Sequence, residues 1–282
     1  MRRIICPCVA HIHAYECANA QVRGYVRFHE RPPRSTEVQR GLPTWGLHDS
    51  TSEPEALGWA RVSYHCHVSY ETALEAFRRG DNVEADRLAQ LDLATATESG
   101  DTAGGVNALC MLARTALRAG RLDDVQMRAV AAQGLAGDEI FLSRIPLHLQ
   151  AVAARMAGRD DDARELYRRS IDLNDALGEV AMAAAEHRNL AYVEVHAGNH
   201  DEARGLFAES RRRLEGVEAP TLLPYLTLDE STVAFLDGDL SSARARLDDA
   251  EAQFAQQGVV PDPDDAAEIS WIRQHLTEGK LS

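Results

Sequence analysis

Apolar residues recur every three or four positions along most of the chain. Leu147, Val152 and Met156 stand before a glycine, and Tyr167 and Ile171 follow it at similar intervals. This spacing places apolar side chains on one face of an α-helix and differs from the alternation of a β-strand. It predicts five pairs of helices, over residues 66–79 and 83–98, 102–119 and 124–136, 143–157 and 161–177, 179–197 and 201–215, and 222–237 and 241–257.

A glycine separates the two helices of each predicted pair. These repeat glycines stand at intervals of 40, 38, 40 and 40 residues and are Gly80, Gly120, Gly158, Gly198 and Gly238. Glycine ends a helix readily because it adopts the left-handed αL conformation without the steric penalty of a Cβ atom. An aspartate follows each of them closely, where its carboxylate can cap the second helix or lie near the positive helix end. The five aspartates are Asp81, Asp123, Asp160, Asp201 and Asp239.

Small or β-branched residues flank each repeat glycine at fixed distances. Ala73, Ala113, Ala151, Ala191 and Ser231 stand seven residues before it, and Ala85, Val125, Ala163, Ala203 and Ala243 stand five residues after it. Such side chains allow two helices to approach closely, so each glycine marks a helical hairpin. One hairpin cannot bury its own apolar face, whereas stacked hairpins share a continuous core. The pattern therefore predicts an all-α array of helical repeats.

This combination of residues resembles the tetratricopeptide repeat over about residues 66–257. The period differs, because it is near 40 residues and the tetratricopeptide repeat has about 34. The longer variant is similar to the sensor region of large bacterial transcriptional regulators. The resemblance implies a right-handed superhelical solenoid of about five helix-turn-helix repeats, which we place at residues 53–260.

The two ends of the chain depart from the repeat pattern. Residues 1–52 are expected to form a poorly ordered or irregular extension. Their Cys6, Cys8, His11 and Cys17 are zinc-binding residue types, but the spacing differs from the usual paired motifs, so we expect no metal site. At the other end, residues 261–282 are expected to form a C-terminal capping segment, with an amphipathic helix over 265–277 that shields the last repeat.

The resemblance also implies which residues line the concave groove. In tetratricopeptide arrays these stand about two, three, six, ten and thirteen positions before the repeat glycine. The 25 corresponding positions include five arginines and three histidines and no Asp or Glu, in a chain with 44 acidic residues. From this set we predict a peptide-binding groove made of Tyr70, Arg78, Asn107, Arg114, Arg118, His148, Arg155, Arg188, Tyr192, His196, Tyr225 and Phe235.

The overall charge narrows the class of partner. The formal net charge of −14 disfavours nucleic acid, whose phosphates the average field of the protein repels. The sequence has no apolar run near 18 residues, so a transmembrane helix is not expected. Five cysteines, Cys6, Cys8, Cys17, Cys66 and Cys110, follow no disulfide framework, and we interpret them as reduced thiols of a cytoplasmic protein.

These observations predict a non-catalytic adaptor or scaffold that binds an acidic or carboxylate-bearing peptide segment. Arginine suits this task because its planar guanidinium grips a carboxylate with two hydrogen bonds. The competing interpretation is that these arginines form ion pairs with neighbouring acids of the chain itself. We find no phosphate-binding loop, zinc-protease motif or nucleophile elbow, and expect no enzymatic activity and no cofactor. Two alternatives stay open: a regulatory sensor segment of a bacterial transcription regulator, and a scaffold that forms homodimers through the apolar last repeat.

Overall fold

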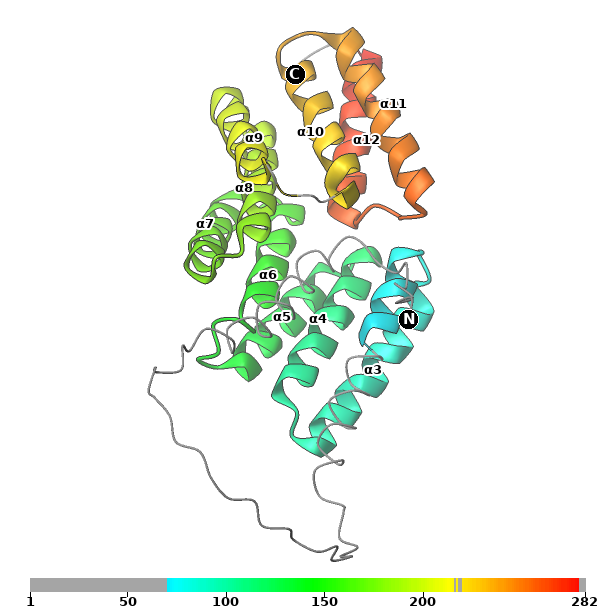
Figure 1. The fold of residues 1–282 in the computed structure, drawn as a ribbon, viewed down its shortest axis with the longest axis vertical. Helices are drawn as coiled ribbons and strands as arrows, with labels where there is room; N and C mark the ends of the chain where they lie inside the picture. The colour runs from blue at the N-terminus through cyan, green and yellow to red at the C-terminus, as the bar shows by residue number, and fades with distance from the viewer. Residues whose placement is uncertain (1–69, 216, 218–219, 279–282) are drawn as a thin grey trace, which may run out of the picture.

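The structure is a computed structural model that describes residues 70–215, 217 and 220–278, and these residues form an array of helices without β-strands (Figure 1). Residues 70–78 are helical and belong to the first predicted pair. The helices that follow are α3 (Asn82–Ser99), α4 (Thr102–Arg118), α5 (Leu122–Ala136), α6 (Arg144–Met156), α7 (Asp160–Leu177), α8 (Val180–His196), α9 (His200–Leu214), α10 (Leu223–Leu236), α11 (Leu240–Gln257) and α12 (Pro263–Glu278). A short 3-10 helix, Pro220–Leu222, precedes α10.

The predicted helix pairs are confirmed over the described residues. From α3 to α11, each helix begins and ends within two residues of the position that the apolar pattern predicts. The predicted extension, residues 1–52, lies outside the described residues, as do four of the five cysteines. Cys110 is described and is buried. No helix of the described part is long and apolar enough to cross a membrane.

The five repeat glycines all adopt the left-handed conformation, with φ between 68° and 83°. At Gly120 the chain turns tightly between α4 and α5. The N–H of Gly120 donates to the carbonyl of Leu117 at 2.9 Å, and the N–H of Arg121 donates to that of Ala116 at 2.9 Å. These two bonds satisfy carbonyl groups that the end of α4 would otherwise leave without partners. The glycine pattern therefore marks hairpin turns, as the sequence predicts.

Aspartates begin the second helices in two ways. Asp81 and Asp239 are N-caps, whose side chains accept hydrogen bonds from the N–H groups of Glu84 and Ser242. Asp123, Asp160 and Asp201 instead lie in the first turns of α5, α7 and α9, where negative charge stabilises the helix N-terminus.

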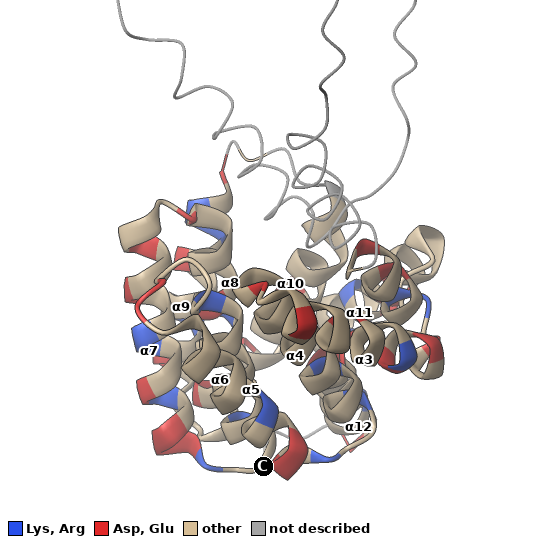
Figure 2. Cartoon of the chain, turned by 90° about the horizontal axis from the view of Figure 1, so that it is seen from below, with Lys and Arg blue, Asp and Glu red and all other residues tan. Residues whose placement is uncertain are grey.

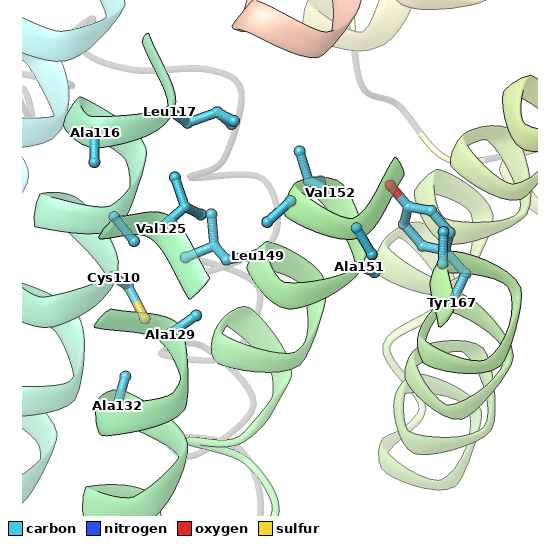
Figure 3. Packing of buried hydrophobic residues seen from close by; sticks show 14 of the residues in the cluster. Cys110, Ala116, Leu117, Val125, Ala129, Ala132, Leu149, Ala151, Val152 and Tyr167 are labelled. Atoms are coloured by element: carbon cyan, nitrogen blue, oxygen red, sulfur yellow. The ribbon is translucent and has the colours of Figure 1, made fainter. Parts of the chain in front are cut away.

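Small side chains bring neighbouring helices together around clusters of buried apolar residues, one of which is drawn in Figure 3. Ala113 of α4 and Val125 of α5 are both fully buried. Val125, Ala129 and Ala132 of α5 pack in the same cluster as Leu149 of α6, and this cluster extends to α7. A second cluster joins α8 and α9 to α10, α11 and α12. The helices therefore bury their apolar faces between repeats, as a solenoid requires.

The first and second helices of the repeats occupy different sides of the array. The first helices α6, α8 and α10 contact α12, and in Figure 2 the second helices α7 and α9 lie at one edge of the array. We call the surface formed by residues 70–78, α4, α6, α8 and α10 the inner face. Many acids lie on the outer helices, where the side chains of Asp161 and Asp201 are fully exposed.

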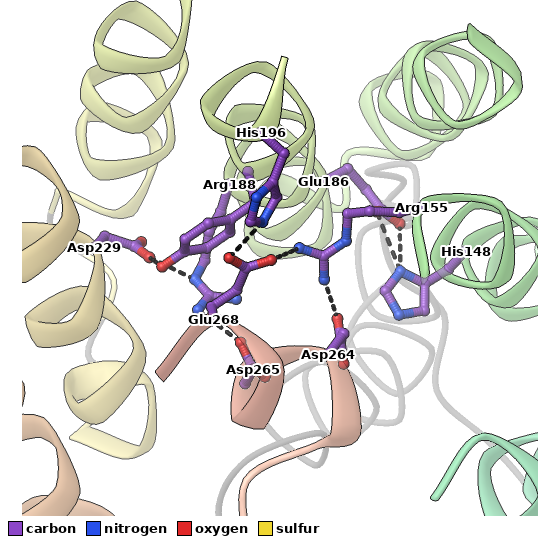
Figure 4. A network of polar contacts seen from close by, with 10 residues as sticks. His148, Arg155, Glu186, Arg188, His196, Asp229, Asp264, Asp265 and Glu268 are labelled. Atoms are coloured by element: carbon purple, nitrogen blue, oxygen red, sulfur yellow. Dashed lines mark hydrogen bonds and ion pairs between the residues drawn. The ribbon is translucent and has the colours of Figure 1, made fainter. Parts of the chain in front are cut away.

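The segment after α11 returns to the first described repeat. The N–H of Val260 donates to the carbonyl of Arg78 at 3.0 Å. From there α12 packs against α10 and α11 through three buried residues, Ile269, Ile272 and Leu276. The first turn of α12 faces α6 and α8 (Figure 4). The C-terminal segment therefore both covers the last repeat and lies across the inner face.

Candidate functional site

Arg155 of α6 is held by two carboxylates of α12 (Figure 4). Its Nη2 donates to Oδ2 of Asp264 at 2.6 Å, and its Nη1 donates to Oε1 of Glu268 at 2.8 Å. The Arg155 and Glu268 side chains are each only 4% exposed. A hydrogen-bonded ion pair of this kind is stronger than one on the surface, since water neither screens it nor competes with it.

Arg188 of α8 joins the same network from the next repeat. Its Nε donates to Oδ1 of Asp229 in α10 at 2.7 Å, and its Nη2 lies 2.7 Å from Oδ1 of Asp265 in α12. The hydroxyl of Tyr192 also donates to Oδ1 of Asp229, at 2.9 Å. Nε2 of His196 lies 2.8 Å from Oε2 of Glu268. The acidic start of α12 is thus held by side chains of two neighbouring repeats, Arg155 of one and Arg188 and His196 of the next.

Burial changes the acidity of this network. It raises the pKa of Asp265 to about 7; Arg188 opposes the change and Asp264 adds to it. Burial also raises the pKa of Asp229, against the opposing charge of Arg188. For Asp264, burial is outweighed by Arg155, and its pKa is lowered. Asp265 therefore holds its proton up to a higher pH than an ordinary aspartate does.

His148 of α6 forms a separate contact with α8. Its Nδ1 lies 3.1 Å from both carboxylate oxygens of Glu186, which is fully buried. The hydroxyl of Ser170 donates to Oε1 of Glu186 at 2.8 Å. Burial alone would lower the pKa of His148, but the Glu186 carboxylate raises it above its usual value. This pairing favours the charged imidazolium.

Arg118 of α4 lies where the first repeat meets the C-terminal segment. Its guanidinium stands 3.7 Å from the centre of the Phe77 ring and donates to the carbonyl of the same residue. Its Nη2 also lies 3.4 Å from Oδ1 of Asp262. The competing interpretation from the sequence, that the arginines pair with acids of the chain itself, therefore describes Arg118, Arg155 and Arg188.

The residues of the predicted groove differ in their surroundings. Tyr70, Tyr192 and Phe235 are buried, and Asn107 is half-buried on α4. Arg78, Arg114, His148, Arg188 and Tyr225 line one pocket of about 140 Å³. Tyr225 also packs edge-on against Phe254, with ring centres 5.0 Å apart. The structure thus brings five of the twelve predicted residues together around a cavity.

The homodimer alternative depends on five apolar residues of the last repeat, Leu222, Leu223, Tyr225, Leu226 and Leu228, and two of them are buried within the chain. Leu222 and Leu228 are buried, and Tyr225 and Leu226 line the pocket. Leu223 is half-exposed.

Sequence reasoning did not identify the acids that face the arginines. Asp262, Asp264, Asp265 and Glu268 come from the C-terminal segment, and Asp229 and Glu186 stand at other positions of the first helices. The available signal was the run Asp262-Pro263-Asp264-Asp265 before an amphipathic helix. It marked a helix N-terminus without indicating the surface on which that helix docks.

Comparison with known proteins identifies the fold. No protein-family model matches the sequence, and no curated protein matches it significantly. A solved Rap protein complexed with Competence and Sporulation Factor superposes with a TM-score of 0.57 and 13% sequence identity. That match covers 78% of this chain and 66% of the Rap chain. BtubC (BKLC) from P. vanneervenii gives a TM-score of 0.47 and 17% identity, covering 79% of this chain and 83% of BtubC. The chain is an all-α helical-repeat solenoid with a fold similar to that of the Rap protein.

Proposed function

We propose that this chain is a non-catalytic protein-interaction module, a long-period variant of the tetratricopeptide repeat, whose inner face binds an acidic segment of a partner protein. The observation that carries the proposal is the way Arg155 and Arg188 hold Asp264, Asp265 and Glu268 of the chain itself. An arginine-lined face that binds one acidic helical turn has the chemistry to bind another. The similarity to a Rap protein solved with a bound factor is consistent with this role.

In this proposal α12 acts as an internal ligand. A tethered segment is present at an effective concentration on the order of millimolar. An external segment of the same chemistry therefore competes poorly while α12 is docked. Partners bind when the docked segment is released, or when their own acidic segment makes more contacts than α12 does.

The proposal is tested with a fluorescent synthetic peptide that has the sequence of residues 261–278. Its binding to the full chain is measured by fluorescence anisotropy, first with the natural sequence and then with Asp264→Asn combined with Glu268→Gln. This double variant keeps the shape of α12 and removes the charges that face Arg155. We expect it to bind the peptide at least about tenfold more tightly, since the internal competitor is weakened.

The matched control is Asp161→Asn combined with Asp201→Asn, which changes the net charge equally at exposed positions of α7 and α9. We expect it to bind as weakly as the natural chain. Adding Arg155→Met to the variant with Asp264→Asn and Glu268→Gln should then return the affinity for the peptide to that of the natural chain. If the variant with Asp264→Asn and Glu268→Gln binds the peptide no more tightly than the control does, the inner face does not bind acidic segments of another molecule.

A further inference from the structure

The segment that the inner face binds begins before α12, at an apolar residue. Residues 259–262 join α11 to α12 in an irregular conformation. The N–H of Val260 donates to the carbonyl of Arg78 at 3.0 Å. Two residues later, Oδ1 of Asp262 lies 3.4 Å from Nη2 of Arg118. The acids that Arg155 and Arg188 hold then follow in α12, so one continuous stretch of chain carries an apolar contact and the ionic contacts.

Val260 packs on the turn of the first described repeat without being enclosed there. A Cβ atom added at Gly80 would lie 3.2 Å from Cγ2 of Val260, so the valine methyl group rests close to the bare Cα atom of the glycine. Val260 is nevertheless 43% exposed. The valine therefore makes only part of the apolar contact that its position offers.

A pocket of about 140 Å³ lies beside Val260, which forms part of its lining. Most of the pocket surface is apolar, and its wall includes Leu74, Phe77, Ile145, Met182, Leu222 and Leu226. A cavity of roughly 150 Å³ accommodates a benzene molecule, so the space suits an apolar group that extends beyond the valine side chain. The lining acids Asp262, Asp264 and Asp265 are already paired with arginines of the repeats. The open part of the pocket therefore favours an uncharged, apolar occupant.

We propose that the acidic segment of the partner carries an apolar side chain of leucine size or larger two residues before its first acid, and that this side chain fills the pocket. The inference rests on the proposed function and specifies its partner. Relative to Val260, the acids of the internal segment follow after two, four, five and eight residues, at Asp262, Asp264, Asp265 and Glu268. A partner with this spacing and a larger apolar residue makes contacts that Val260 lacks, and so displaces the internal segment.

A first experiment uses the full chain without any peptide. Val260→Leu should raise the unfolding temperature, because the longer side chain extends into the pocket and buries more apolar surface. The matched control is Val83→Leu, since Val83 is 83% exposed on α3 and its longer side chain stays in water. We expect the control to leave the unfolding temperature nearly unchanged.

A second experiment measures binding by fluorescence anisotropy to the variant with Asp264→Asn and Glu268→Gln. The probes are fluorescent peptides of residues 258–278, with the natural sequence, with Val260→Leu and with Val260→Ser. We expect the leucine peptide to bind about threefold more tightly than the natural peptide, since one more methylene group is buried. The serine peptide should bind at least about threefold more weakly. A peptide with Ser270→Leu, at an exposed position of α12, should bind as the natural peptide does.

A variant of the receptor places the effect in the pocket. Ala185→Leu fills the pocket from α8 and should remove the difference between the leucine and natural peptides. The control Ala131→Leu, at an exposed position of α5, should preserve that difference. Circular dichroism shows whether Ala185→Leu is folded, and if it is not, the peptide series decides the test.

The inference fails separately from the proposed function. If the natural, leucine and serine peptides bind with equal affinity, the inner face binds acidic segments but does not select an apolar residue, and only the inference is overturned. If none of the peptides binds, the proposed function and the inference are both overturned. A natural chain with Val260→Leu that is no more stable than Val83→Leu would show that the pocket does not accept a larger side chain, and would also overturn the inference.

Discussion

Arg155 and Glu268 are 113 residues apart in the sequence and form a buried ion pair of 2.8 Å between α6 and α12. Because both side chains are removed from water, each charge depends on the other for its stability. The pair thus fixes the position of α12 on the inner face, while apolar contacts attach the other side of α12 to the last repeat.

Loss of Arg155 should destabilise the chain strongly. Arg155→Met leaves Asp264 without its hydrogen-bonded partner and Glu268 with only His196. Breaking a buried pair by removing one partner costs about 3–5 kcal/mol, and urea denaturation measures the loss directly. The control is Arg169→Met, which breaks an exposed pair of 3.8 Å with Glu165 and should cost about 1 kcal/mol or less. Equal losses in the two variants would mean that the buried pair does not hold α12.

Features that depend on neighbouring residues could be predicted from the sequence. The apolar period predicted each helix, and the repeat glycines predicted each hairpin turn, because αL geometry and helix amphipathicity are local properties. Counting back from each repeat glycine also placed Arg155 and Arg188 on the inner face. Their acidic partners could not be predicted in this way, since Asp264 and Glu268 belong to a segment outside the repeats.

The docking of α12 shows why that part of the site was missed. Ile269, Ile272 and Leu276 form a stripe that predicted an amphipathic cap, and these residues do pack on the last repeat. Such a stripe predicts which face of a helix is buried, but it does not predict what the polar first turn of that helix contacts. The position of Asp264 and Asp265 follows from the superhelical path of the whole array, which returns residue 260 to Arg78.

Two glycines of similar exposure should respond in opposite ways to alanine. Gly158 has a φ of 68°, and Gly205 lies within α9. A Cβ atom at either position meets nothing within 4 Å, so only the backbone differs. Gly158→Ala should destabilise by about 1–2 kcal/mol through left-handed strain, whereas Gly205→Ala should stabilise by about 0.5–1 kcal/mol through helix propensity. Thermal denaturation gives the sign of each change, and a stabilising Gly158→Ala would contradict the hairpin turn at this position.

Asp265 should make the stability of the chain depend on pH. Its folded pKa is raised to about 7, and that of an unfolded aspartate is about 3.9. Between these values the folded state holds the proton more tightly than the unfolded state. The contribution of Asp265 is therefore complete below about pH 4 and is lost as the pH rises through about 7.

The measurement compares urea denaturation from pH 5 to pH 8 in the natural chain and in Asp265→Asn. We expect the free energy of unfolding to fall more steeply with pH in the natural chain, because the variant cannot ionise at this position. Asp161→Asn, at an exposed position, should keep the natural slope. Identical slopes in the natural chain and Asp265→Asn would show that Asp265 ionises alike in both states.

Weakening the apolar side of α12 should release its acidic side as well. Ile272 is fully buried against the last repeat, and Ile272→Ala should cost about 2–5 kcal/mol. Because α12 is the last described helix, we expect part of this loss to appear as local opening of α12, with faster amide hydrogen exchange there than in α6. The exposed Gln274→Ala should change stability by no more than about 0.5 kcal/mol. If Ile272→Ala also increases binding of the peptide of residues 261–278, then the apolar and ionic contacts of α12 form one cooperative unit. Faster exchange without increased binding would show that the first turn stays paired with Arg155 and Arg188 while the rest of α12 opens.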